Sequence, residues 1–236
     1  MAAANRFLDP AAPALRAVFL LGTLKPGQGE FSHTEALCEL VIENLRGYNV
    51  DSEIIRLVEY EIKAGVESDM GHGDQWPEIL KKVLASDIIV FATPIWWGIQ
   101  SSLIQRVIER MDALNDELLE TGRSELANKV GGMVITGAED GAEHIIGNIA
   151  NFIVWNGMTL PPACSVSFLG DYTGETKESL LRKFREQKST ASMARTMTRN
   201  VVFFARLLKE NNIPQDEKGV SQNLAPGTVG LRGDKG

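Results

Sequence analysis

Residues 87–103 read DIIVFATPIWWGIQSSL, and this stretch decides the fold of the chain. Its five apolar residues 88–92 follow one another without alternation, which is typical of a β-strand buried on both faces of a parallel sheet. We expect Pro94 to end the strand because it has no N–H to donate, and Gly98 permits a close approach of the backbone to a ligand. Apolar side chains then recur at helical spacing over residues 101–114, which predicts that a helix follows the strand.

The rest of the chain repeats this order of strand and helix. Four further stretches have the composition of buried strands: residues 17–21, 50–57, 130–136 and 165–169. Further helices are expected at residues 32–45, 76–85, 142–155 and 191–209, the last after a charged connection over residues 182–188. Strands that alternate with helices predict an α/β domain with a doubly wound, five-stranded parallel sheet and helices on both faces. Ligands of such sheets bind at the carboxyl ends of the strands.

The composition excludes several classes of protein. The 236 residues include 24 Lys and Arg against 31 Asp and Glu, and the formal net charge of −7 argues against a nucleic-acid-binding protein. With 44% hydrophobic and 23% charged residues, the chain is neither disordered nor a disulfide scaffold. Cys38, Cys164 and the three histidines lack the spacing of metal ligands, so we expect no metal site. We find no membrane-spanning run or signal peptide and expect a cytoplasmic protein.

The first candidate for a binding site is the loop that follows the strand at residues 17–21. Residues 22–34 read GTLKPGQGEFSHT and lead into a helix that begins near Ser32. Free backbone N–H groups at a helix start, together with hydroxyl groups and Lys25, suit the terminal phosphate of a ligand. The dinucleotide fingerprint GxGxxG and the Walker pattern do not occur here. The alternative is a surface loop in which Ser32 caps the helix and no ligand binds.

Two further loops follow the strands at residues 87–93 and 130–136. In the first, Trp96 and Trp97 stand where a planar ring would lie against them, although tryptophans also serve as core or interface anchors. In the second, Thr136 and Gly137 place a hydroxyl group and a permissive backbone at the end of the strand. The three loops together predict one ligand site at the carboxyl edge of the sheet.

Over residues 16–169 the chain resembles the flavodoxin-like NAD(P)H-dependent FMN reductases and quinone reductases. The segment Thr93-Pro94-Ile95-Trp96-Trp97-Gly98 is similar to the TPxYxG-type loop that holds the flavin ring in that family. Gly22-Thr23-Leu24-Lys25 and Ser32-His33-Thr34 stand at the two ends of the family's GSxRxxGNT loop, with His33 in the asparagine position. Thr136-Gly137 resembles the third flavin loop. The compact cysteine cluster of the family's iron–sulfur branch does not occur in this sequence.

The resemblance implies a flavodoxin-like strand order, 2-1-3-4-5, and noncovalently bound FMN. NADH or NADPH would reduce the FMN, which would pass two electrons to a quinone-like or other small acceptor. Because the flavin carries this chemistry, no catalytic side chain is expected. The implied contacts are Thr23, Lys25, Ser32, His33 and Thr34 at the phosphate, Pro94, Ile95, Trp96, Trp97 and Gly98 at the ring, and Thr136 and Gly137 in the third loop.

The expected organisation is an N-terminal extension (1–15), an FMN-binding domain (16–211) and a flexible C-terminal tail (212–236). Trp96 and Trp97 at an exposed rim favour a homodimer or homotetramer. Two alternative functions stay open: a flavodoxin-type single-electron carrier and a noncatalytic FMN-binding module. Four basic residues either form a solvated helix face or bind the 2′-phosphate of NADPH: Lys177, Arg182, Lys183 and Arg185.

Overall fold

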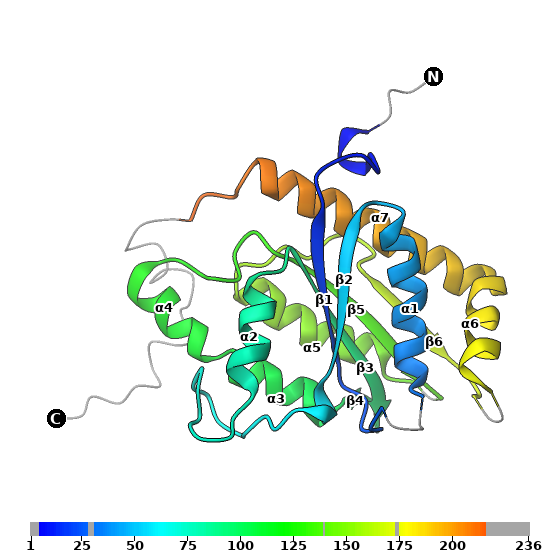
Figure 1. The fold of residues 1–236 in the computed structure, drawn as a ribbon, viewed down its shortest axis with the longest axis horizontal. Helices are drawn as coiled ribbons and strands as arrows, with labels where there is room; N and C mark the ends of the chain where they lie inside the picture. The colour runs from blue at the N-terminus through cyan, green and yellow to red at the C-terminus, as the bar shows by residue number, and fades with distance from the viewer. Residues whose placement is uncertain (1–4, 28–30, 139, 173–174, 216–236) are drawn as a thin grey trace.

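A parallel sheet forms the centre of the protein, which Figure 1 shows as a computed structural model. The structure describes residues 5–27, 31–138, 140–172 and 175–215. The order of the long strands is β2-β1-β3-β5-β6, and a short strand, β4, pairs antiparallel with β3. The expected order 2-1-3-4-5 is therefore confirmed. The strands are β1 (Leu15–Leu21), β2 (Val50–Arg56), β3 (Ile88–Trp96), β4 (Ile99–Gln100), β5 (Val130–Gly137) and β6 (Ser165–Leu169).

Helices cover both faces of the sheet, with α1 and α6 on one side and α2 and α3 on the other in Figure 1. Neighbouring residues of β5 show why both layers fit closely. A Cβ on Gly131 would lie 2.5 Å from Ile153 of α5, and one on Gly132 would lie 2.8 Å from Met197 of α7. The helices are α1 (His33–Arg46), α2 (Trp76–Leu84), α3 (Ser102–Arg110), α4 (Ala113–Thr121), α5 (Ala142–Trp155), α6 (Lys177–Glu186) and α7 (Lys188–Glu210), with short 3-10 turns η1 (Arg6–Leu8) and η2 (Leu57–Glu59).

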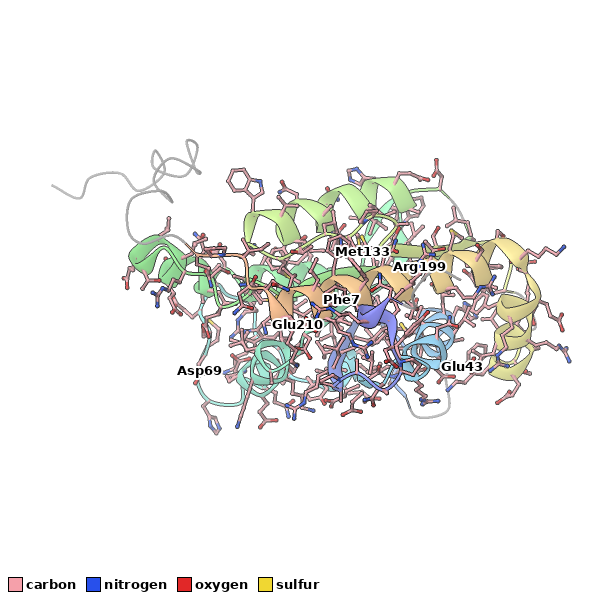
Figure 2. The ribbon with its side chains drawn as sticks, turned by 90° about the horizontal axis from the view of Figure 1, so that it is seen from above. Phe7, Glu43, Asp69, Met133, Arg199 and Glu210 are labelled. Atoms are coloured by element: carbon pink, nitrogen blue, oxygen red, sulfur yellow. The ribbon has the colours of Figure 1, made fainter. Side chains whose placement is uncertain are left out.

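The core follows from burial of the strands on both faces. Every side chain of β1 except that of Arg16 is buried, and β5 is buried from Val130 to Thr136. Met133 of β5 lies at the centre of the molecule in Figure 2, which looks along the sheet from above. Strands in this position gain stability from apolar side chains on both faces, which explains their unbroken hydrophobic runs.

Two expectations about helices are wrong, one for the charged connection at residues 182–188 and one for the end of the helix at residues 101–114. Residues 182–186 belong to α6 and are not a connection, because Thr176 and Ser179 form a capping box and the side chains of Leu180 and Phe184 are buried. The helix expected over residues 101–114 ends at Arg110, and a separate helix, α4, follows it.

The N-terminal turn η1 packs against the last helix, α7, where the rings of Phe7 and Phe203 lie edge to face. Arg206 of α7 donates hydrogen bonds to the carbonyls of Phe7 and Asp9, at 3.0 and 2.8 Å. Residues 216–236 of the expected tail lie outside the described residues. Its beginning contacts the loop after α4, where Ser124 N donates to Gln215 Oε1 at 2.6 Å. Among the described residues, no helix is both long enough and apolar enough to cross a membrane.

The loop between η2 and α2 is held by a fully buried ion pair. Arg110 of α3 binds Asp74 through two hydrogen bonds, of 2.7 and 3.0 Å, and both side chains are 0% exposed. The same guanidinium donates to the carbonyls of Glu67 and Lys63. The hydrogen bonds from Arg110 are the main reason that the pKa of Asp74 lies well below its usual range. This pair therefore couples α3, which follows β4, to the loop beyond β2.

We expect Arg110→Met to lower the free energy of unfolding by about 3–5 kcal/mol, because the Asp74 carboxylate would lose its partner inside the protein. Lys82→Met is the matched control, since Lys82 pairs with Glu53 at the surface and its loss should cost less than about 1 kcal/mol. Urea unfolding at neutral pH, followed by circular dichroism, measures both. Equal losses would contradict the prediction. Because folding lowers the pKa of Asp74, its contribution is present above the unfolded-state pKa and is lost as pH falls below about 4.

Candidate functional site

Three loops meet at the carboxyl edge of the sheet, the lower edge in Figure 1. They follow β1, β3 and β5, which are adjacent strands. The first and third loops are joined by a hydrogen bond of 2.6 Å between the hydroxyl groups of Thr34 and Thr136, both of which are buried. The sequence pattern predicted that these loops form one site, and the structure brings Thr34 and Thr136 together.

The loop after β1 presents the start of helix α1. Ser32 caps the helix by accepting a hydrogen bond from Glu35 N at 3.3 Å. The N–H groups of His33 and Thr34 have no acceptor within the helix, and they lie at its positive end. Thr23 accepts a bond from Lys25 N at 3.3 Å, which turns the chain at the end of β1. Residues 28–30 of this loop lie outside the described residues.

His33 turns its ring toward the end of β6. The imidazole stacks on the ring of Tyr172, with centroids 4.2 Å apart and planes inclined by 7°, and Phe31 packs edge-on at 5.3 Å. Burial lowers the pKa of His33 below its usual range, the positive charge of Lys25 lowers it further, and Glu175 opposes both. The ring of His33 therefore packs between the first loop and the segment after β6.

Tyr172 was not predicted from the sequence. Its hydroxyl group donates to the carbonyl of Phe168 at 2.7 Å, and its ring lies 5.4 Å from that of Phe168. Burial raises the pKa of Tyr172 well above its usual range, although hydrogen bonds with Gly137 and Thr136 oppose this. The tyrosine thus links β6, the third loop and His33. The available signal in the sequence was an aromatic residue three positions after the last strand, β6.

The strand β3 does not end at Pro94, where the sequence predicted its end. It continues to Trp96, because residues 95 and 96 pair with β4, and a two-residue hairpin turn follows. Ile95 pairs with Gln100 and Trp96 with Ile99, which leaves Trp97 and Gly98 at the turn. Both turn residues have positive φ, +51° and +80°, as in the type I′ turns that suit the twist of hairpins. A tryptophan pays a conformational cost in this region, where glycine does not. Trp97 is 97% exposed and Trp96 48%, so neither side chain is packed into this chain's core.

The hairpin packs against the third loop, which follows β5. Pro94 of β3 lies beside Thr136 of β5 in the register of the sheet. A Cβ on Gly137 would lie 2.8 Å from the side chain of Ile95, and one on Gly141 would lie 2.7 Å from Gly98. Small residues in the third loop therefore let the hairpin approach closely. Residue 139 lies outside the described residues.

These groups fit a ligand with a phosphate at one end and a flat ring at the other. The start of α1 offers N–H donors and hydroxyl groups beside the charge of Lys25, which is a donor set for a phosphate monoester. The hairpin offers backbone amides and two exposed indole rings to a planar group. Among the described residues there is no group of three or more His, Cys, Asp or Glu side chains that could hold a metal ion.

A comparison with known families decides which ligand this is. The sequence profile of the family described as NADPH-dependent FMN reductase matches residues 15–172, which contain all three loops. The chain belongs to this family. As an FMN reductase it is an oxidoreductase that binds FMN and uses NAD(P)H, as the resemblance of its loops implied.

Two named proteins are similar to this chain over most of its length. An 8-demethyl-8-aminoriboflavin-5′-phosphate synthase from Streptomyces davaonensis is 27% identical over 218 residues, which cover 89% of this chain and 84% of the relative. A protein named divalent metal cation transporter MntH from Mycobacterium bovis is 37% identical over 171 residues, 71% of this chain. The chain spans only 25% of the length of that relative.

Solved structures show the same fold. A crystal structure of RosB with bound 8-demethyl-8-formylriboflavin-5′-phosphate has a TM-score of 0.73 and 27% identity, covering 84% of this chain and 82% of RosB. An NADH:FMN oxidoreductase, EMOB, has a TM-score of 0.59 at 15% identity, covering 85% of this chain and 92% of its own, and supports the fold alone.

The basic residues near the carboxyl end of the FMN reductase are largely paired. Lys177 pairs with Glu39 and Lys183 with Glu175. Arg185 binds Glu43 of α1, which faces α6 in Figure 2. These pairs favour the interpretation of a solvated helix face over that of a 2′-phosphate site for NADPH.

We expect Lys25→Ala to raise the pKa of His33, because it removes a positive charge that disfavours the imidazolium form. The pKa of His33 should return only part of the way to its usual value, since burial is the larger cause of the lowered pKa. A histidine-selective NMR titration measures the change, and the signals of His72 and His144 serve as internal controls. A His33 titration that does not move would show that Lys25 is not oriented toward the start of α1.

Proposed function

We propose that this FMN reductase passes two electrons from NAD(P)H to a quinone-like or other small acceptor, and that it works in the cytoplasm. The observation that carries the proposal is the exposed turn of the hairpin, where Trp97 is 97% exposed. A ring held against this hairpin is accessible to other planar molecules from solvent. NAD(P)H and the acceptor would therefore use one open face in turn, which predicts ping-pong kinetics.

The side chains and amides of the site have binding and orienting roles. The N–H groups of His33 and Thr34 and the charge of Lys25 would hold the phosphate of FMN. Thr23 and Ser32 shape the loop around it, through their bonds to Lys25 N and Glu35 N. FMN, when bound, supplies the exchange of hydride.

The ring would lie between the hairpin and the third loop. Pro94 pairs with Thr136 in the register of the sheet, the side chain of Ile95 lies against Gly137, and the backbone of Gly98 approaches Gly141, which supports this placement. The amides near the turn would bind the polar edge of the ring. Trp96 and Trp97 would border its open face, where aromatic side chains add burial and stacking.

A second candidate function follows from RosB, which binds a modified riboflavin phosphate. Similarity over 82% of the RosB chain extends beyond a shared phosphate loop. In this alternative a flavin phosphate is the substrate of the site and leaves with an altered ring. The mass of the flavin recovered after turnover distinguishes the two, because a cofactor is recovered unchanged.

The hairpin also supports a homodimer or homotetramer. Its exposed apolar side chains, Trp96, Trp97 and Ile99, lie next to one another on a two-strand ribbon. Aromatic residues of this kind are enriched at protein interfaces, and a second copy of the chain would remove them from water. Association would then form beside the proposed ring site.

We expect Trp97→Gly to weaken self-association and FMN binding and to leave the free energy of unfolding within about 1 kcal/mol, because glycine accepts a positive φ. Sedimentation velocity, flavin fluorescence titration and urea unfolding give the three readouts. Val66→Gly removes another exposed apolar side chain and should change none of them. A wild-type protein that stays monomeric at every concentration would contradict the oligomer.

We expect the FMN-loaded protein to lose its long-wavelength flavin absorbance on anaerobic mixing with NADH or NADPH, and to regain it when a quinone is added. Free FMN under the same conditions is the control. If neither nucleotide reduces the protein within minutes, a flavodoxin-type electron carrier explains the site better.

A further inference from the structure

Arg56 is a buried charge that the roles assigned so far do not use. It is the last residue of β2 and is only 8% exposed. Burial of a guanidinium group is costly unless hydrogen bonds and opposite charges compensate for the lost water. The partners of Arg56 therefore show what its burial secures.

The side chain of Arg56 joins three segments around the first loop. Its Nη1 donates to the carbonyl of Lys25 at 2.8 Å, and its Nη2 forms an ion pair with Glu35 in the first turn of α1. Its Nε lies 3.7 Å from Oε1 of Glu59 in η2. A single residue of β2 thus connects the loop after β1, the helix start and the turn that follows β2.

Glu59 adds a second attachment to the same loop. Its Oε1 accepts a hydrogen bond from Gly27 N at 3.1 Å. A Cβ on residue 27 would lie 2.4 Å from that oxygen, so glycine permits this close approach. The carbonyl of Lys25 and the amide of Gly27 are therefore both fixed by the Arg56–Glu59 pair.

The charges matter as much as the geometry. Glu35 is an acidic residue in the first turn of α1, the end of the helix where a phosphate would bind. An unpaired carboxylate there would repel a phosphate over a short distance, and Arg56 balances it. Without Arg56 the first loop would lose one positive charge and the hydrogen bond at Lys25 together.

We propose that Arg56 is the positioning residue of the phosphate site, and that it makes the protein select flavins that carry a 5′-phosphate. It acts through Lys25, Gly27 and Glu35, which it holds in place and neutralises. The proposal rests on the proposed role of the first loop in holding the phosphate of FMN. It adds a specificity determinant from a strand outside the three loops.

The test compares FMN with riboflavin, which lacks the phosphate, in Arg56→Met. Flavin fluorescence quenching should show FMN affinity reduced roughly ten- to hundredfold and riboflavin affinity reduced far less. Arg106→Met is the matched control, because Arg106 also donates to a loop carbonyl, that of Ile62. It should leave the ratio of the two affinities unchanged. Equal losses for both flavins in Arg56→Met, or no loss, would overturn the proposal.

A second pair of variants separates charge from folding. Glu35→Gln added to Arg56→Met should restore part of the FMN affinity, because it removes the carboxylate that Arg56 had balanced. If Arg56→Met does not fold, Arg56→Lys keeps the charge but cannot donate to Lys25 and Glu35 through two separate nitrogens. The affinity for FMN should still fall more than the affinity for riboflavin. An unchanged FMN-to-riboflavin ratio in Arg56→Lys, or no restoration in the double variant, would contradict the proposal.

Inorganic phosphate distinguishes failure of this inference from failure of the proposed function. Its binding to the wild type and to Arg56→Met can be followed by phosphorus NMR without any flavin. Phosphate binding that depends on Arg56, in a protein that takes up no FMN, would support the positioning role and overturn the flavin assignment. FMN binding that is unchanged in Arg56→Met would overturn the positioning role and leave the flavin assignment in place.

Discussion

The hydrogen bond between Thr34 and Thr136 connects the two halves of the site. It joins the start of α1 to the end of β5 at 2.6 Å, in a place from which water is excluded. Two buried hydroxyl groups would each be costly without a partner, so the bond fixes the position of the helix start over the sheet. The ends of β1 and β5 lie on either side of β3, and the ring hairpin therefore stands next to the proposed phosphate end.

Burial of the strands on both faces explains what the sequence could predict. In β5 and in α5 the apolar pattern is dense, and the helix expected at residues 142–155 coincides with the observed α5. In α6 only Leu180 and Phe184 are buried among charged neighbours, so the periodic signal was too weak and the segment was expected to be a connection. Local capping by Thr176 decides that helix, and capping is a contact between side chain and backbone that hydrophobic patterning does not detect.

Part of the candidate site could be predicted from the sequence and part could not. The loops after β1, β3 and β5 could be located because parallel strands end at a shared edge. Arg56 could not be assigned, since its partners Lys25, Glu35 and Glu59 are brought to it only by the folded chain. The positive φ of Trp97 was equally hidden, because a bulky side chain is the last one expected at such a turn.

Arginines explain why one half of the site is fixed and the other exposed. Arg56 holds the loop after β1, and Arg110 holds the loop after η2, each by binding main-chain carbonyls and a carboxylate. Guanidinium groups suit this task because several donors in one plane fix a loop at more than one point. Among the residues that the structure describes, no arginine supports the tip of the hairpin, where Trp97 adopts a costly conformation and is exposed to water. A cofactor that stays bound benefits from the fixed loop after β1. Reactants that bind and leave in each turnover benefit from the exposed hairpin. The buried charges therefore lie where the proposed reaction needs a fixed binding site.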